Sequence, residues 1–191
     1  MDQLHLPHTG VWDAFTHSHM SVLTLFLLYA VPLSVVPPVM IYYAGVTYGG
    51  GLLPALSDMQ LQIIGILFFL TELAMTFLVA YVIQRMGDVI DIKPAFEDAY
   101  KLAVVVPTPL WLVPLFLFIP SFMVNLTAVS AALMISGILI FRNVPSILRV
   151  EEKGHAILLS GSILAAGLVA WAAMMYLTLI SWSMITASPM I

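Results

Sequence analysis

Long apolar segments separated by short polar stretches dominate the chain. A helix needs about 20 apolar residues to cross the hydrocarbon layer of a bilayer. Five segments reach this length, and they cover approximately residues 20–44, 60–83, 98–119, 121–141 and 155–182. The pattern therefore predicts an all-α membrane protein built as a bundle of five transmembrane helices. The third and fourth helices are joined by a very short turn at Pro120.

The composition supports this fold class and excludes several functions. Hydrophobic residues make up 62% of the chain and charged residues 8%, whereas soluble domains carry about 25% charged residues. The absence of cysteine excludes disulfides, thiolate metal sites and thiol catalysis. A formal net charge of −4 argues against nucleic-acid partners.

The positive charges fall in two short windows. Arg85, Lys93 and Lys101 follow the second helix, and Arg142, Arg149 and Lys153 follow the fourth. Basic loops are retained on the cytoplasmic side of a membrane. With an odd number of spans, this predicts a cytoplasmic amino terminus and a periplasmic carboxyl terminus. We divide the chain into a cytoplasmic or interfacial segment (1–19), a transmembrane domain (20–182) and a periplasmic tail (183–191).

Glu72 lies near the middle of the second predicted helix. A carboxyl at this depth is costly, so we expect it to face the bundle interior and to be neutral at pH 7. Arg85 is about 20 Å further along the helix, which excludes an ion pair between them. Thr108 and the carbonyls freed by Pro107 and Pro109 are the expected hydrogen-bond partners. Glu72 is then either a proton or cation site or a structural acid.

Prolines interrupt two of the predicted helices. Pro32, Pro37 and Pro38 lie in the first, and Pro107, Pro109 and Pro114 lie in the third. Each proline removes a backbone donor and frees the carbonyl four residues earlier. A group of these residues lies at similar depth and forms a candidate intramembrane polar site: Pro32, Ser34, Glu72, Pro107 and Thr108, with Pro109 beside them. Broken helices at the midplane are typical of transporters, but kinked packing helices are the interpretation we favour.

All five histidines map to the predicted cytoplasmic side. The candidate metal ligands are His17, His19 and His155. His17 and His19 are two residues apart, so on a helix they would face different directions. We therefore interpret the histidines as part of an interfacial polar rim and expect no cofactor.

Three short motifs follow one another across the five spans. They are His17-Ser-His19 with Ala30-Val-Pro32 and Tyr43-Ala-Gly45, then Thr108-Pro109-Leu110, and then Val144-Pro145-Ser146-Ile147 with Glu151-Glu152-Lys153-Gly154. In this order they resemble the bacterial branch of the Yip1 family of small inner-membrane proteins. The resemblance implies five spans, a cytoplasmic amino terminus and an inner-membrane location. Eukaryotic relatives resemble Rab-associated trafficking factors with a long amino-terminal region. We do not expect that role here, because about twenty residues precede the first span.

These observations lead to three functional hypotheses. The first is a non-enzymatic role in organising the membrane or binding a partner, because the sequence shows no phosphate loop, dinucleotide fingerprint, serine elbow or paired catalytic carboxylates. The partners would be membrane lipids and another membrane protein or a second copy of the chain. The second is a small ion or solute transporter or channel around Glu72. The third and weakest is a metal or pH sensor on the cytoplasmic face.

Overall fold

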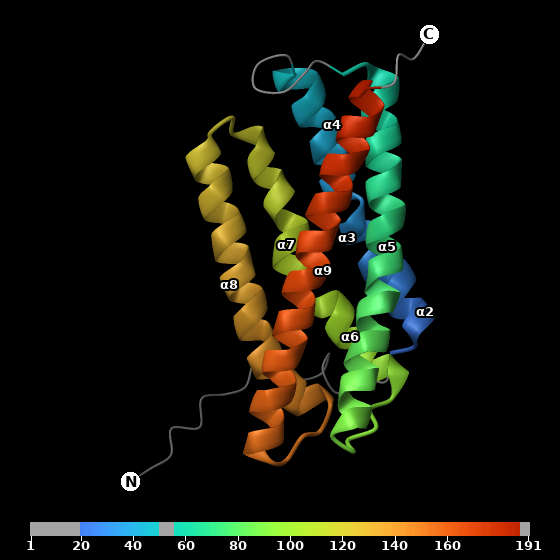
Figure 1. Cartoon of the computed structure of the whole chain (residues 1–191), viewed down its shortest axis with the longest axis vertical. Coiled ribbons are helices and arrows are strands. Elements are labelled where there is room, and N and C mark those ends of the chain that lie inside the picture. Colours follow the sequence, from blue (N-terminus) through green and yellow to red (C-terminus); the bar gives the residue numbers. More distant parts are fainter. Residues whose placement is uncertain (1–19, 50–55, 188–191) are drawn as a thin grey trace.

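The computed structural model describes residues 20–49 and 56–187, and these residues are helical with short connections and no strand. Five helical stretches are long and apolar enough to cross a membrane: Val22–Tyr48, Asp58–Val89, Phe96–Phe118, Phe122–Ile147 and Lys153–Ile185. Figure 1 shows them running lengthwise beside one another. The prediction of a five-helix transmembrane bundle is confirmed.

The first span is broken into four pieces, as its prolines predicted. It consists of α2 (Val22–Leu25), a π-helical turn (Phe26–Ala30), α3 (Val31–Ser34) and α4 (Val36–Tyr48). The Val31 N–H bonds the Phe26 carbonyl five residues back, directly before Pro32. The wider π-helical turn leaves space for the Pro32 ring, which would otherwise clash with the backbone of the preceding turn.

The third span is broken in the same way. It consists of α6 (Phe96–Val105), α7 (Thr108–Leu112) and a 3₁₀ turn (Val113–Phe118). Pro107, at φ −78° and ψ 0°, interrupts the helix between α6 and α7. Pro114 lies in the first turn of the 3₁₀ segment, where its missing N–H is tolerated.

The other three spans are continuous helices. They are α5 (Asp58–Val89), α8 (Phe122–Ile147) and α9 (Lys153–Ala187). Ser57 and Gln60 form a reciprocal capping box at the start of α5. Helix α9 continues past Trp182 to Ala187, and neither glycine nor proline occurs between these two residues.

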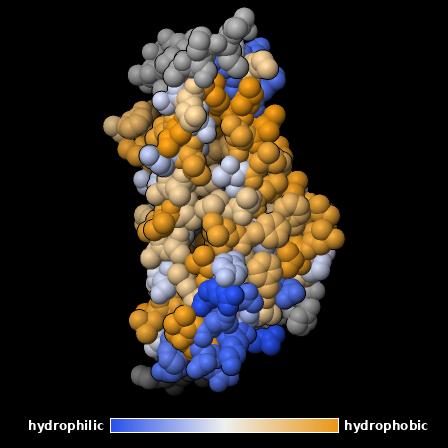
Figure 2. Space-filling view, turned by 45° about the vertical axis from the view of Figure 1, so that its right-hand side comes forward, coloured by the Kyte–Doolittle hydropathy of each residue, from blue (hydrophilic) through white to orange (hydrophobic). Residues whose placement is uncertain are grey.

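The buried core lies nearer one end of the bundle, around α6. All residues from Ala99 to Val105 are buried, so α6 is enclosed on every side after its first turn. This end also carries the α5–α6 linker (90–95) and the α8–α9 linker (148–152), and we call it the basic end. It lies at the bottom of Figure 1, with the end of α4 and the start of α5 at the top. In Figure 2, hydrophilic residues gather at the lower end, below a largely apolar body.

Candidate functional site

Glu72 lies on α5, which contacts α3, and α3 in turn contacts α7. Its side chain is half-buried, and the Trp111 side chain on α7 is its polar neighbour. Since an indole can only donate, the Trp111 N–H is the donor in any hydrogen bond between them. The Oε2 atom of Glu72 is buried and has no hydrogen-bond partner. The polar neighbour of Glu72 on the third span is therefore Trp111.

Thr108 is occupied by other partners. Its hydroxyl lies 2.8 Å from the Val105 carbonyl and 3.3 Å from the Val104 carbonyl. Pro109 lacks the N–H that would otherwise bond Val105, so Thr108 satisfies the carbonyl that the proline frees. The Thr108 hydroxyl also meets the Tyr29 hydroxyl at 2.7 Å. The expected bond between Thr108 and Glu72 is wrong, because the broken helix uses this hydroxyl locally.

Ser34 completes this group, which we call the mid-span polar cluster: Tyr29, Ser34, Glu72, Thr108 and Trp111. Ser34 is fully buried, and its Oγ atom has no hydrogen-bond partner. Two contacts set the level at which α5 passes the first span. The Phe26 and Phe77 rings are 5.4 Å apart, and the Cβ of Pro38 lies 3.5 Å from the position a Gly65 Cβ would take.

The sequence reasoning missed Tyr29 and Trp111. Both carry an apolar ring with a polar tip, and such a tip usually finds a partner when it is buried. Their rings lie 6.5 Å apart. An aromatic residue with a polar tip, one helical turn from a proline break, was the available signal.

The candidate site prolines differ in exposure: Pro32 is exposed, whereas Pro107 and Pro109 are half-buried.

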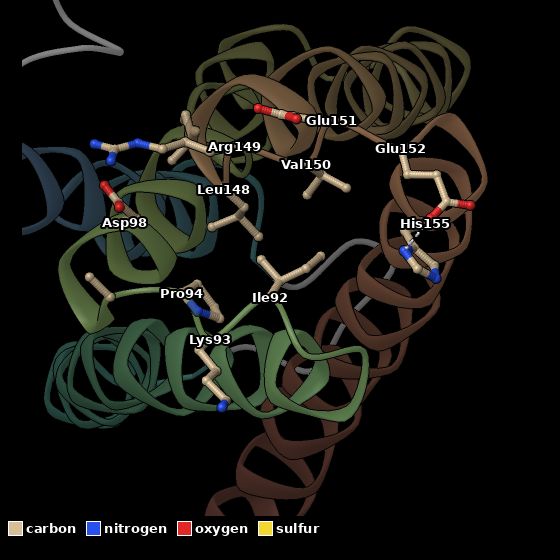
Figure 3. A pocket seen from close by; sticks show the side chains of 12 residues that line it. Ile92, Lys93, Pro94, Asp98, Leu148, Arg149, Val150, Glu151, Glu152 and His155 are labelled. Atoms are coloured by element: carbon tan, nitrogen blue, oxygen red, sulfur yellow. Dashed lines mark ion pairs between the residues drawn. The ribbon is translucent and has the colours of Figure 1, made fainter.

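A second candidate site is a pocket of about 540 Å³ at the basic end. Both linkers contribute to it, and Figure 3 shows its walls. The lining residues are Ile92, Lys93, Pro94, Ala95, Asp98, Ile147, Leu148, Arg149, Val150, Glu151, Glu152 and His155. The sequence analysis singled out Glu151, Glu152 and His155 but did not predict that the two linkers meet.

The α5–α6 linker is folded tightly against the end of α5. The Ile92 N–H bonds the Gly87 carbonyl at 3.0 Å, and Gln84 Nε2 donates to the Pro94 carbonyl at 3.2 Å. A Cβ on Gly87 would lie 2.5 Å from the Pro94 ring, so only glycine permits this approach. Asp91 and Lys93 have φ values of 60° and 49°.

The α8–α9 linker is also held by local bonds. The Val150 N–H bonds the Pro145 carbonyl at 3.0 Å, and Arg149 has a φ of 54°. His155 Nδ1 lies 2.9 Å from Glu152 Oε2. The family-like motif residues Pro145, Glu151 and Glu152 therefore shape or line the pocket.

Of the three proposed metal ligands, His155 lies within the described residues. His155 is exposed and paired with Glu152. His17 and His19 lie outside the described residues. Within 20–49 and 56–187, no three His, Asp or Glu side chains are grouped so that they could hold a metal ion. The metal hypothesis therefore stays a prediction.

Comparison with known proteins identifies the family. A family model described as the Yip1 domain matches residues 7–174, which is most of the chain. No curated protein and no solved structure matches it. The match covers the first four spans and most of the fifth span. Together with the five apolar helices, it shows that the chain is a multi-pass membrane protein and belongs to the Yip1 family.

Proposed function

We propose that this Yip1-family protein is a non-enzymatic component of a bacterial inner membrane that organises the membrane or binds a partner through its basic end. The separation of charged from apolar surface carries this proposal. Apart from Asp58 and Glu72, every described Asp, Glu, Lys and Arg lies within residues 85–101 or 142–153. Away from the basic end, the large exposed side chains of the spans are mostly apolar, as lipid contact requires.

The orientation follows from the same charges. Both windows of Lys and Arg lie at the basic end, so we place that end in the cytoplasm. A partner would then approach from the cytoplasm or lie beside the bundle in the membrane. Another membrane protein and a second copy of this chain are the two partner classes that fit.

Photo-crosslinking in intact cells tests this function. A photoreactive amino acid at Ser146, exposed at the basic end of α8, should give an adduct of one discrete mass. The matched position is Leu126, which is 49% exposed near the opposite end of the same helix. It should give only lipid adducts. An adduct of twice the chain mass would identify self-association. The absence of a protein adduct from Ser146, Glu97 and Lys153 alike would contradict the proposal.

A second function, proton or cation transport, is favoured by one observation. Two oxygen atoms of the mid-span polar cluster, Glu72 Oε2 and Ser34 Oγ, are buried without a hydrogen-bond partner. Buried oxygens with free lone pairs can accept a proton or coordinate a cation. Purified protein in liposomes loaded with a pH-sensitive dye tests this. Transport predicts a proton flux that Glu72→Gln abolishes, whereas equal traces for the two proteins and empty liposomes would rule it out.

A further inference from the structure

We propose that the pocket at the basic end binds the headgroup of a zwitterionic phospholipid, of the phosphoethanolamine type. The depth and lining of the pocket point to a lipid, and the mixture of charges on its walls points to a headgroup that carries both signs. This inference stands on the pocket alone and does not depend on a protein partner.

The first argument is the depth of the pocket. Helices α5 and α8 end at it, at Val89 and Ile147, and α6 and α9 begin at it, at Phe96 and Lys153. Four spans therefore leave the hydrocarbon layer at this level, which is where phospholipid headgroups lie. A ligand already present in the membrane reaches the pocket without crossing a barrier.

The second argument is the apolar part of the lining. Half of the lining residues are apolar: Ile92, Pro94, Ala95, Ile147, Leu148 and Val150. In Figure 3, the Ile92, Leu148 and Val150 side chains point toward the middle of the pocket. This lining suits the glycerol and upper acyl carbons of an amphiphile, whereas a small hydrated ion would gain nothing from it.

The third argument is the balance of charge. Two cationic side chains, Lys93 and Arg149, share the lining with three carboxylates, Asp98, Glu151 and Glu152. Figure 3 shows Arg149 beside Asp98 on one side and Glu152 beside His155 on the other. A purely anionic headgroup would meet three carboxylates, and a purely cationic one would meet the guanidinium. A headgroup that carries one positive and one negative charge can interact favourably with both the guanidinium and the carboxylates of the pocket.

The chemistry of the donors selects ethanolamine over choline. A guanidinium presents paired donors that match the oxygens of a phosphate, which assigns the phosphate to Arg149. A primary ammonium offers three N–H donors to carboxylate acceptors, which assigns it to Glu151 and Glu152. The methyl groups of choline offer no such donors.

The fourth argument is that the linkers hold their shape before any ligand binds. Asp91, Lys93 and Arg149 have positive φ values, which residues other than glycine rarely adopt. Such backbone conformations concentrate at ligand-binding segments, where the surrounding bonds enforce them. Lys93 and Arg149 are themselves lining residues, and a pocket held in place loses less entropy on binding.

Native mass spectrometry of the delipidated full-length protein tests the proposal. The protein in detergent is titrated with phosphatidylethanolamine, phosphatidylglycerol and phosphatidylcholine of identical acyl chains. One phosphatidylethanolamine should bind per chain, about tenfold more tightly than either of the others, as expected from one charge-assisted hydrogen bond.

Two substitutions locate the site, and each has a matched control. Arg149→Gln and Glu151→Gln should each weaken phosphatidylethanolamine binding by about tenfold. The controls are Arg142→Gln and Glu97→Gln, which make the same charge changes at exposed basic-end positions outside the lining. They should leave the affinity unchanged. Circular dichroism of all four variants confirms that they are folded.

Four results would overturn the proposal. Equal binding of phosphatidylglycerol would show that the pocket recognises the phosphate alone. Equal binding of phosphatidylcholine would show that the N–H donors of the ammonium group do not contribute to recognition. Free phosphoethanolamine that competes at the affinity of the lipid would identify a soluble ligand instead. Equal losses in the site variants and their controls would show that the lipid binds elsewhere.

Discussion

The hydroxyls of Tyr29 and Thr108 lie 2.7 Å apart, although 79 positions separate them in the chain. Thr108 has one proton to donate, and its 2.8 Å contact with the Val105 carbonyl uses it. Tyr29 is then the donor to Thr108. This relay of two hydrogen bonds ends on the carbonyl that Pro109 frees and joins the broken first span to the broken third span.

Replacing Tyr29 by phenylalanine should lower the free energy of unfolding by about 1 kcal/mol, the size of one hydrogen bond between membrane helices. Thr108 keeps its bond to Val105, so its own helix remains satisfied. Denaturation in mixed micelles measures the change. Tyr176→Phe is the control, because Tyr176 is 65% exposed, and it should be neutral. Equal stability of Tyr29→Phe and the parent protein would contradict the relay.

The Trp111 and Glu72 side chains should be energetically coupled. Trp111→Phe removes the N–H donor and keeps an aromatic ring, and Glu72→Leu removes the acceptor. In a double-mutant cycle, the loss in the double variant should differ from the sum of the single losses by about 0.6–1.7 kcal/mol. Trp171→Phe, on α9, replaces Trp111→Phe in the control cycle. Additive losses in the Trp111 cycle would mean that Glu72 has another partner.

Gly87→Ala should destabilise the basic end. Its Cβ would lie 2.5 Å from Cδ and 2.6 Å from Cγ of Pro94, and a proline ring cannot rotate away. Overpacking of this kind costs about 1–3 kcal/mol. Gly161→Ala is the control, because nothing lies within 4 Å of its Cβ position, so it should be neutral or stabilising. Thermal unfolding of the two variants side by side measures the difference, and equal midpoints would refute the clash.

The orientation can be measured with reporter fusions. A reporter active only in the cytoplasm should work when the chain is truncated after Gly87 or Gly154 and fused to it there, and should be silent when it is fused after Ile191. The reason is the confinement of Lys and Arg to the two windows at the basic end. An active reporter after Ile191 would overturn the predicted orientation of the termini.

The sequence by itself determined the number of spans, the positions at which they break and the end that carries charge. These properties depend only on the order of apolar, charged and proline residues along the chain. A span needs about 20 apolar residues, and a proline removes a backbone donor wherever it lies. The breaks at Pro32 and Pro107 could therefore be predicted without knowing which helices are neighbours.

Only the tertiary structure decided which polar groups meet. The sequence predicts the depth of Glu72 but not the rotation of α5 about its axis, which depends on packing against α4, α6 and α9. It could not show that the Tyr29 hydroxyl would meet Thr108 or that Trp111 would be the polar neighbour of Glu72. The pocket depends on two linkers far apart in the chain, whose positive φ values and contacts are set by packing.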